Sequence, residues 1–326
     1  MNFGPESLLL IGILGLDAVW GDPVYPLHPV RLIGLFCSRM EKILRRLEIP
    51  GRLGGMILSI SIVLGVFLIW TGIYAVLISI HDYLGFLWQL YTGWSLLASR
   101  DLIEHARKVW NAMDNNDLEQ CQLMTGRMVG RDTSNMNFSA SGRAVIESLS
   151  ENLNDGVIAP LFFFIFFGIP GMLVYKVVNT LDSMVGYRNR NYQNFGWASA
   201  RLDDLLNWLP ARLTWVLIGI AAALHPKCCG KLALTVGWTH HHGVSSPNAG
   251  WCEAAAAGAL QARLCGPIWR EGKLASQHWL GPQHFREGGT VDDMRHMAQL
   301  TVLAAVIFAL LGLLIMQHLA IPFYGL

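Results

Sequence analysis

Residues 143–214 read RAVIESLSENLNDGVIAPLFFFIFFGIPGMLVYKVVNTLDSMVGYRNRNYQNFGWASARLDDLLNWLPARLT. This stretch places charged and amide side chains between and beside strongly apolar runs. Polar groups near lipid are expensive, and a membrane protein does not carry them for packing alone. The stretch therefore predicts a functional site within or beside a membrane.

The composition indicates a membrane protein. Hydrophobic residues make up 53% of the 326 residues and charged residues 14%, with a mean hydropathy of +0.38. Residues 53–80 carry no charge, and residues 300–312 begin an equally apolar tail. A spanning helix needs about 20 such residues, so both segments are predicted to cross the bilayer. Shorter apolar runs are found at residues 7–20, 84–98, 157–175 and 213–224.

The distribution of Lys and Arg predicts the orientation of the first helices. Residues 21–52 hold six Lys and Arg, whereas residues 81–83 hold none. By the positive-inside rule, residues 53–80 run outward from the cytoplasm and residues 84–98 return to it. The polar, helix-friendly residues 99–156 are then a cytoplasmic excursion.

Residues 157–224 do not fit a simple crossing, because one crossing would place Lys176 and several arginines outside. The tetrapeptide at 168–171, Gly-Ile-Pro-Gly, puts a helix breaker and two glycines in mid-run, and residues 213–224 are short for a span. We expect an all-α integral membrane protein whose transmembrane helices include re-entrant or broken ones around a cytoplasm-facing polar cavity.

The expected organisation is a single membrane-embedded enzyme domain, residues 1–326. Its parts are the N-terminal membrane helices with a cytoplasmic loop (7–98), the helical excursion (99–156), the broken region (157–224), a cytoplasmic segment (225–299) and a C-terminal transmembrane helix (300–323).

Several classes of function lack their sequence signals. The net charge is +1 and no basic stripe is interleaved with aromatics, so nucleic acid is not an expected partner. The six cysteines form no C-x-x-C pair, which favours reduced thiols. Residues 266–274 resemble a P-loop, but the spacing is one residue too long and Leu follows the Lys.

Two carboxylates are predicted to share a helix face. If residues 143–154 are helical, Glu147 and Glu151 lie four apart, with Ser148 and Asn152 on the adjacent face. Like charges at this spacing repel unless a cation lies between them, and Mg²⁺ prefers such oxygen ligands. We therefore predict a magnesium site at Glu147, Glu151 and Asp155. The alternative is a solvated acidic face.

Polar stripes continue downstream. One follows the helical spacing i, i+3, i+4, i+7: Lys176, Asn179, Thr180 and Ser183. Another repeats every three residues beside Asp203: Arg201, Asp204 and Asn207. Arg212 follows just beyond. The alternatives are a stripe facing water or a neighbouring helix, and an intrahelical ion pair between Arg201 and Asp204.

Three further segments are candidates. The Gly-Asp-Pro and His-Pro sequences are expected to hold Asp22, His28 and Arg31 in a rigid loop at the membrane surface. Arg131 is suited to clamp a phosphate, or belongs to a helix-capping turn. The three histidines at 240–242 suggest zinc, but their side chains diverge on a helix and no matching ligand pair has metal spacing.

Long motifs resemble a known family. They are RDT at 131–133, ESLSENLNDGVIAPLFF at 147–163, YKVVNTLDSMVGYRN at 175–189, FGWASARLDDLLNWLPARLT at 195–214 and SPNAGW at 246–251. An N-terminal pattern with Asp17, Asp22-Pro23 and His28-Pro29-Val30 also fits. Together they resemble the adenosylcobinamide-phosphate synthases of cobalamin biosynthesis, the CbiB/CobD family, over nearly the whole chain.

The resemblance implies an inner-membrane ligase with a cytoplasmic active site. Such an enzyme joins adenosylcobyric acid to (R)-1-amino-2-propanol phosphate through an amide bond, with ATP as co-substrate and Mg²⁺. The amine donor stays open between this phosphate, ethanolamine phosphate and the free alcohol. Implied partners are the small-molecule substrates, the lipid bilayer and other membrane enzymes of cobalamin assembly. Alternatives are a membrane sensor of the related β-lactamase-regulator type and an anion transporter, although no internal repeat supports transport.

Roles can be offered residue by residue. The catalytic candidates are Glu147, Glu151, Asp182, Asp203 and Asp204. The candidates for binding substrate or phosphate are Asp22, His28, Arg31, Arg131, Asp132, Asn152, Lys176, Asn179, Arg188, Arg201, Asn207, Arg212, Ser246 and Asn248.

Overall fold

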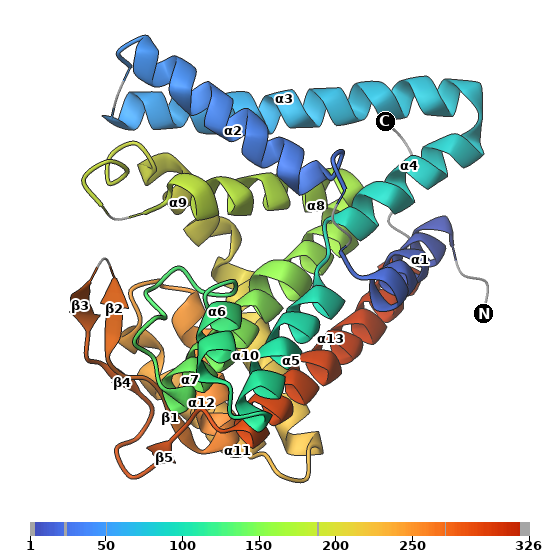
Figure 1. Cartoon of the computed structure of the whole chain (residues 1–326). Helices are drawn as coiled ribbons and strands as arrows, with labels where there is room; N and C mark the ends of the chain where they lie inside the picture. The colour runs from blue at the N-terminus through green and yellow to red at the C-terminus, as the bar shows by residue number, and fades with distance from the viewer. Residues whose placement is uncertain (1–3, 23–24, 50, 188, 271, 320–326) are drawn as a thin grey trace. The chain divides into compact units, whose positions relative to one another are not determined.

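The computed structural model describes residues 4–22, 25–49, 51–187, 189–270 and 272–319. Most of these residues are helical, as expected, and five short strands occur between 262 and 287 (Figure 1). The chain divides into two compact units. Unit 1 comprises Met1–Ala98, Ala159–Asn207 and Leu311–Leu326, and unit 2 comprises Ser99–Ile158 and Trp208–Leu310.

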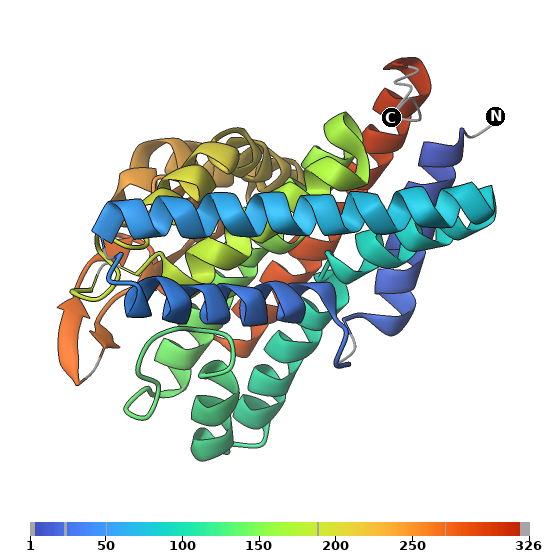
Figure 2. The same cartoon turned by 90° about the horizontal axis from the view of Figure 1, so that it is seen from above.

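The described part of unit 1 consists of helices joined by loops and contains no strand. Its helices are α1 (Pro5–Trp20), α2 (Pro29–Arg46), α3 (Gly51–Ile80), α4 (Asp82–Ser95), α8 (Ala159–Val185), α9 (Trp197–Leu206) and the end of α13 (Val291–Leu319). Figures 1 and 2 both show α2 lying beside α3. The core between α2, α3 and α8 is built from buried apolar side chains that include Leu58, Val177, Leu181 and Phe195.

Helix α8 is broken where the sequence predicts it. Gly168 has φ 63° and ψ −163°, which is outside the helical region, and Pro170 follows within the helix. Glycine tolerates a positive φ because it has no Cβ, whereas proline removes a backbone donor. The expectation of a broken helix at residues 168–171 is therefore confirmed.

Unit 2 combines helices with a small β region. Its helices are α5 (Ser99–Asp114), α6 (Leu118–Thr125), α7 (Phe138–Leu153), the π-helix η1 (Asn154–Ile158), α10 (Trp208–Leu224), α11 (Gly230–His240), the 3₁₀ turn η2 (His241–Gly243), α12 (Ala249–Leu260) and the start of α13. The strands are β1 (Ala262–Cys265), β2 (Ile268–Arg270), β3 (Lys273–Ser276), β4 (Trp279–Leu280) and β5 (Arg286–Glu287). Strand β1 pairs antiparallel with β4 and parallel with β5, while β2 and β3 form a separate antiparallel hairpin.

Helix α12 is the most buried element of unit 2. Every residue of its sequence, AGWCEAAAAGAL, is buried. Small residues allow close helix packing, and a Cβ on Gly258 would collide with the carbonyl oxygen of Leu232 on α11. The single charged residue of this helix, Glu253, is therefore held inside the unit.

The long apolar helices confirm an α-helical membrane protein. Within the described residues, three runs are long and apolar enough to span a membrane: Gly51–Ile80, Phe138–Val185 and Val291–His318. The predicted span at residues 53–80 lies within the first run, and residues 300–318 of the predicted C-terminal span 300–323 lie within the third. Residues 320–323 of that prediction lie outside the described residues. The consecutive helices α9 and α10 qualify together as a fourth, bent candidate, a broken span or a re-entrant loop.

Replacing Gly55 by Ala tests the packing of α3 in unit 1. A Cβ at Gly55 would overlap the backbone carbonyl of Phe195, which cannot rotate away. Overpacking of this kind costs about 1–3 kcal/mol, so we expect Gly55→Ala to lower the thermal unfolding midpoint in detergent. The control is Gly72→Ala on the same helix, where nothing lies within 4 Å of the added Cβ. Equal midpoints for the two variants would contradict the contact.

Candidate functional site

A polar cavity lies within unit 2. Its volume is about 550 Å³, within the range of small-molecule sites. Four segments line it: residues 128–131, one face of α7, residues 243–253 from the loop before α12 into that helix, and residues 265–278 around the β2–β3 hairpin. Its polar side chains include Arg131, Glu147, Ser148, Glu151, Ser245, Ser246, Glu253, Arg270, Ser276 and His278.

Arg131 and Glu147 form a buried ion pair in this cavity. Arg131 Nη2 donates to Glu147 Oε2 at 2.7 Å, and the two side chains are 9% and 10% exposed. The other carboxylate oxygen accepts the backbone N–H of Cys265 at 2.8 Å. Arg131 Nε is buried and has no partner among the described residues. The wall of the cavity therefore carries a buried guanidinium whose hydrogen-bonding capacity is not fully used.

Glu253 adds a carboxyl group that the sequence analysis missed. It is 6% exposed, and the Cys265 thiol lies 3.7 Å from its Oε2. Burial raises the pKa of Glu253 well above its ordinary value, and the charges of Glu147 and Glu151 raise it further. Burial likewise raises the pKa of the Cys265 thiol. The cavity thus favours a protonated carboxyl at this position.

The β2–β3 hairpin contributes Arg270 and Ser276 to the cavity, and His278 follows just after it. Asp132 anchors this hairpin. Asp132 Oδ2 accepts the backbone N–H of Gly272 at 2.7 Å, and its own N–H donates to the carbonyl of Trp269 at 3.0 Å. Asp132, a predicted substrate ligand, thus anchors the hairpin in the structure.

The π-helix η1 continues α7 at the Asn-Asp-Gly sequence. Asn154 Nδ2 donates to Asp155 Oδ1 at 2.7 Å, and Asn154 Oδ1 accepts from the Thr214 hydroxyl on α10 at 3.1 Å. Asn152 instead bonds back within α7, to the carbonyl and hydroxyl of Ser148. Single π-turns inside helices are frequent at functional sites.

The SPNAGW segment forms the entry to α12. Ser246 Oγ accepts the backbone N–H groups of Asn248 and Ala249, which orders the turn leading into α12. Asn248 Oδ1 accepts from Arg212 Nη1 at 3.3 Å. Arg212 also lies over the rings of Trp208 and Trp251, at 4.6 and 5.0 Å. The structure therefore brings the predicted Arg212 and Asn248 together.

The predicted magnesium ligands do not by themselves form a metal site. Both oxygens of Glu147 are engaged, one by Arg131 and one by the Cys265 amide. Among the described residues, no three His, Cys, Asp or Glu side chains gather closely enough to hold a metal ion. Mg²⁺ at Glu147, Glu151 and Asp155 stays a prediction.

A second group of predicted residues lies in unit 1, where α8 faces α9. Asn179 Nδ2 donates to Asp203 Oδ1 at 3.3 Å, and Asn207 Nδ2 donates to Asp203 Oδ2 at 3.0 Å. Tyr175, also on α8, donates its hydroxyl to Asn207 Oδ1 at 2.9 Å. Asn179 of the predicted polar stripe thus faces a neighbouring helix, whereas the Thr180 and Ser183 hydroxyls donate to carbonyl groups within α8.

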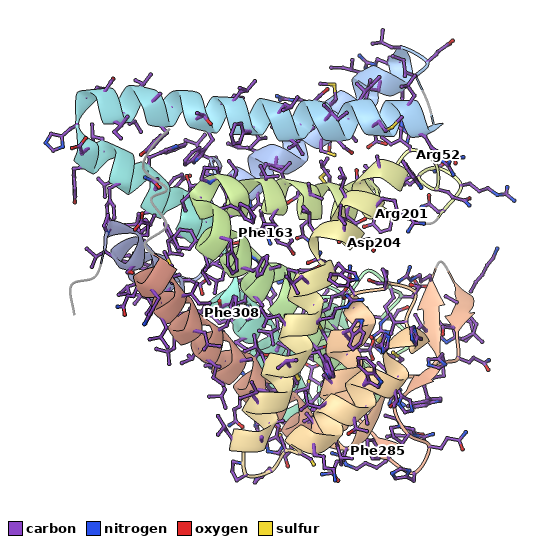
Figure 3. The ribbon with its side chains drawn as sticks, turned by 180° about the vertical axis from the view of Figure 1, so that it is seen from behind. Arg52, Phe163, Arg201, Asp204, Phe285 and Phe308 are labelled. Carbon is purple, nitrogen blue, oxygen red and sulfur yellow. The ribbon has the colours of Figure 1, made fainter. Side chains whose placement is uncertain are left out.

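The other predicted residues of α8 and α9 are half-buried or exposed. Arg201 and Asp204 form the intrahelical ion pair considered from the sequence, at 3.7 Å, with Arg201 67% exposed (Figure 3). Lys176 and Asp182 are half-buried on α8. Arg188 lies outside the described residues.

The N-terminal candidates are partly brought together. His28 Nε2 and Asp22 Oδ1 are 2.5 Å apart, and His28 is 3% exposed. The loop is tied to α4 by Trp94 Nε1, which donates to the Gly21 carbonyl, and by Tyr25, whose hydroxyl bonds that of Ser95. Arg31 is exposed on α2.

The histidines at 240–242 take part in an aromatic cluster. The His241 ring stacks on Trp251 at 3.7 Å, and its Nδ1 lies 2.8 Å from the Trp238 carbonyl oxygen. These contacts account for His241 without a metal.

A signal for one missed residue was present in the sequence. Glu253 is the single charge in the apolar run 249–262, the same kind of signal that singled out residues 143–214. Arg270 and His278 had no such signal, because only the hairpin and its anchor at Asp132 bring them to the cavity.

Comparison with known proteins agrees with the resemblance in the sequence. The family model described as CobD/Cbib protein matches residues 9–316. "Cobalamin biosynthesis protein CbiB" of Salmonella typhi is 39% identical over 296 residues, covering 90% of this chain and 92% of the relative. "Cobalamin biosynthesis protein CobD" of Citrobacter koseri is 40% identical over 295 residues, covering 90% and 92%. The protein of the same name from Photorhabdus laumondii is 40% identical over 306 residues, covering 92% and 95%.

No solved structure shows significant similarity to the chain. The family model and these relatives all extend over nearly its full length. The chain therefore belongs to the CobD/CbiB family.

Proposed function

We propose that this protein acts in cobalamin biosynthesis as an amide-bond-forming ligase. It joins the carboxylate of adenosylcobyric acid to the amine of (R)-1-amino-2-propanol phosphate, with ATP as co-substrate, and releases adenosylcobinamide phosphate. The names of relatives that are 39–40% identical support the pathway. The observation that carries the chemical assignment is the polar cavity of unit 2, where cations and carboxylates meet around Arg131 and Glu147.

The reaction must activate a carboxylate, which is a poor acyl donor. The carboxylate oxygen attacks the γ-phosphorus of ATP, so that an acyl phosphate forms and ADP leaves. The free amine then attacks the acyl carbon, the C–N bond forms, and inorganic phosphate leaves. The ammonium group of the amine donor must lose a proton first, so a nearby base is required. Mg²⁺, when bound to ATP, offsets the charge of the phosphates.

The cavity of unit 2 suits the phosphate-bearing substrates. Arg131 Nε has no partner among the described residues, and Arg270 lines the same space. Arginine forks match phosphate oxygens. Glu151 faces the same cavity and is a candidate to accept the proton of the ammonium group. In unit 1, Asp182, Asp203 and Asp204 stay candidates for that role.

The size of the cavity limits what enters it. About 550 Å³ suits a drug-sized molecule, such as an amino-alcohol phosphate or a nucleotide. A corrinoid is larger, so in our proposal only the arm that carries its reacting carboxylate enters. We place the enzyme in the bacterial inner membrane with a cytoplasmic active site, as expected from the sequence. The positive-inside rule favours the cytoplasm for the loop between α1 and α3.

Reconstitution tests the reaction directly. Purified full-length protein in detergent would be mixed with adenosylcobyric acid, the amine donor, ATP and Mg²⁺, and the corrinoid followed by mass spectrometry. We expect adenosylcobinamide phosphate and ADP in equal amounts, and no product without ATP. Ethanolamine phosphate and the free amino alcohol, offered separately, identify the donor. Folded protein that yields no amide with any of the three amines would contradict the ligase.

Variants of the buried pair test the site. Breaking a buried ion pair costs about 3–5 kcal/mol, because the remaining charge is left unpaired. We expect Arg131→Gln or Glu147→Gln alone to lower both the unfolding free energy and turnover, the latter at least 100-fold. The double variant should regain part of the stability but not the turnover. Exposed Arg107→Gln, in the same unit, is the control. Turnover that recovers together with stability would show that the pair only supports the fold.

Glu253 predicts a dependence of stability on pH. The pKa of Glu253 is raised in the folded state, so the folded protein keeps a proton that the unfolded protein loses once the pH exceeds the ordinary pKa of about 4.5. Stability contributed by this group therefore falls as pH rises above 4.5, by up to about 1.4 kcal/mol per pH unit until the folded pKa is reached. We expect Glu253→Gln to unfold at a higher temperature than the parent, by a margin that grows from pH 5 to pH 8. Exposed Glu119→Gln on α6 should show a constant difference, and a constant margin for Glu253→Gln would refute the raised pKa.

A further inference from the structure

An apolar groove lies within unit 1, apart from the residues assigned to catalysis. Its volume is about 460 Å³, and it lies between the N-terminal half of α2, the middle of α3, α4 and α8. Its lining includes Leu32, Phe36, Ile69, Ile73 and Leu173. No charged side chain belongs to this lining in the described part of the chain. The groove therefore suits a hydrocarbon chain rather than a polar substrate.

One hydrogen-bond donor in the groove lacks an acceptor. Thr92 accepts from Trp70 Nε1 and donates to the Trp88 carbonyl, and the Tyr91 hydroxyl donates to the Leu27 carbonyl. Trp88 Nε1 is buried without a hydrogen-bond partner among the described residues. A buried donor left without an acceptor costs about 1–3 kcal/mol. An acceptor on a ligand in the groove would remove that cost.

Helix α2, whose N-terminal half lines the groove, also carries a row of cations. On a helix of 3.6 residues per turn, four basic side chains fall within about 80° of one another: Arg31, Arg39, Lys42 and Arg46. All four are exposed, and none has an ion-pair partner within the described residues. The adjacent face carries exposed Phe36, Ile43 and Leu47, of which Phe36 lines the groove. Such a helix, basic on one face and apolar on the next, is typical of binding to acidic lipid.

We propose that this groove binds an acidic phospholipid. An acyl chain fills the space between α2, α3, α4 and α8, and Trp88 Nε1 donates to an ester carbonyl of the lipid. The cations of α2 attract its phosphate and its negatively charged head group. The site does not rest on the ligase activity, because none of the groove's lining residues was assigned a role in the reaction.

Thermal stability of the delipidated full-length protein in detergent provides the test. Dioleoyl phosphatidylglycerol and dioleoyl phosphatidylcholine would be added in equal steps, with the bound lipid counted by native mass spectrometry. We expect saturable binding of phosphatidylglycerol at least tenfold tighter than of phosphatidylcholine, with a matching rise in the unfolding temperature. Equal affinity for the two lipids would overturn the assignment to acidic lipid.

Trp88→Phe separates the hydrogen bond from packing. Phenylalanine keeps an aromatic ring but removes the unpartnered donor. We expect phosphatidylglycerol to bind the variant about fivefold more weakly, the equivalent of about 1 kcal/mol. Relative to the parent protein, Trp88→Phe should lower the unfolding temperature less without lipid than with bound phosphatidylglycerol. Unchanged binding would rule out the bond to Trp88.

Two further variants test the groove and the cations. Ile69→Trp fills the groove from α3, whereas Leu64→Trp adds the same bulk on an exposed part of α3 outside it. Only the first should abolish saturable binding. Replacing Arg39, Lys42 and Arg46 by Gln should remove the preference for phosphatidylglycerol, whereas replacing exposed Arg107 and Lys108 on α5 should not. Binding that survives Ile69→Trp would overturn the site.

Discussion

The ion pair between Arg131 and Glu147 is the contact on which the cavity of unit 2 depends. It joins the loop before α7 to α7 itself, and the same carboxylate binds the Cys265 amide at the end of β1. Burying two charges is costly, and the cost is offset only when their hydrogen bonds are made. Here both carboxylate oxygens are bonded, while Arg131 Nε is left over. The pair thus joins three segments around the cavity and leaves one guanidinium N–H without an acceptor among the described residues.

Irregular helices make room for these polar groups. The fully buried α12 packs against α11 through Gly258, and this close approach holds Glu253 inside unit 2. The π-helix η1 carries Asn154, whose side chain bonds both Asp155 and Thr214. In unit 1, α8 breaks at Gly168 before its polar stripe meets α9. Backbone groups freed by such breaks are tolerated near lipid only when protein or a polar cavity surrounds them.

Features that depend on neighbours in sequence could be predicted, and features that depend on distant segments could not. Helical spacing placed Glu147 and Glu151 on one face of α7, and Gly168 with Pro170 marked the break in α8. The same spacing allowed the Arg201–Asp204 pair. In contrast, Asp132 meets Gly272 across 140 positions, and the hairpin it anchors has strands of only three and four residues. Such short strands have no periodicity to detect, so Arg270 and His278 were missed.

Two buried donors without acceptors point to two different ligands by the same reasoning. Arg131 Nε lies in a cavity lined by carboxylates, serines and a second arginine, where a charged oxygen is the fitting acceptor. Trp88 Nε1 lies in a groove whose lining is almost wholly apolar, where a charged acceptor would be poorly solvated. A neutral ester carbonyl on a hydrocarbon chain satisfies that donor at no such cost. The surroundings of each donor, more than the donor itself, therefore decide which chemistry it can recognise.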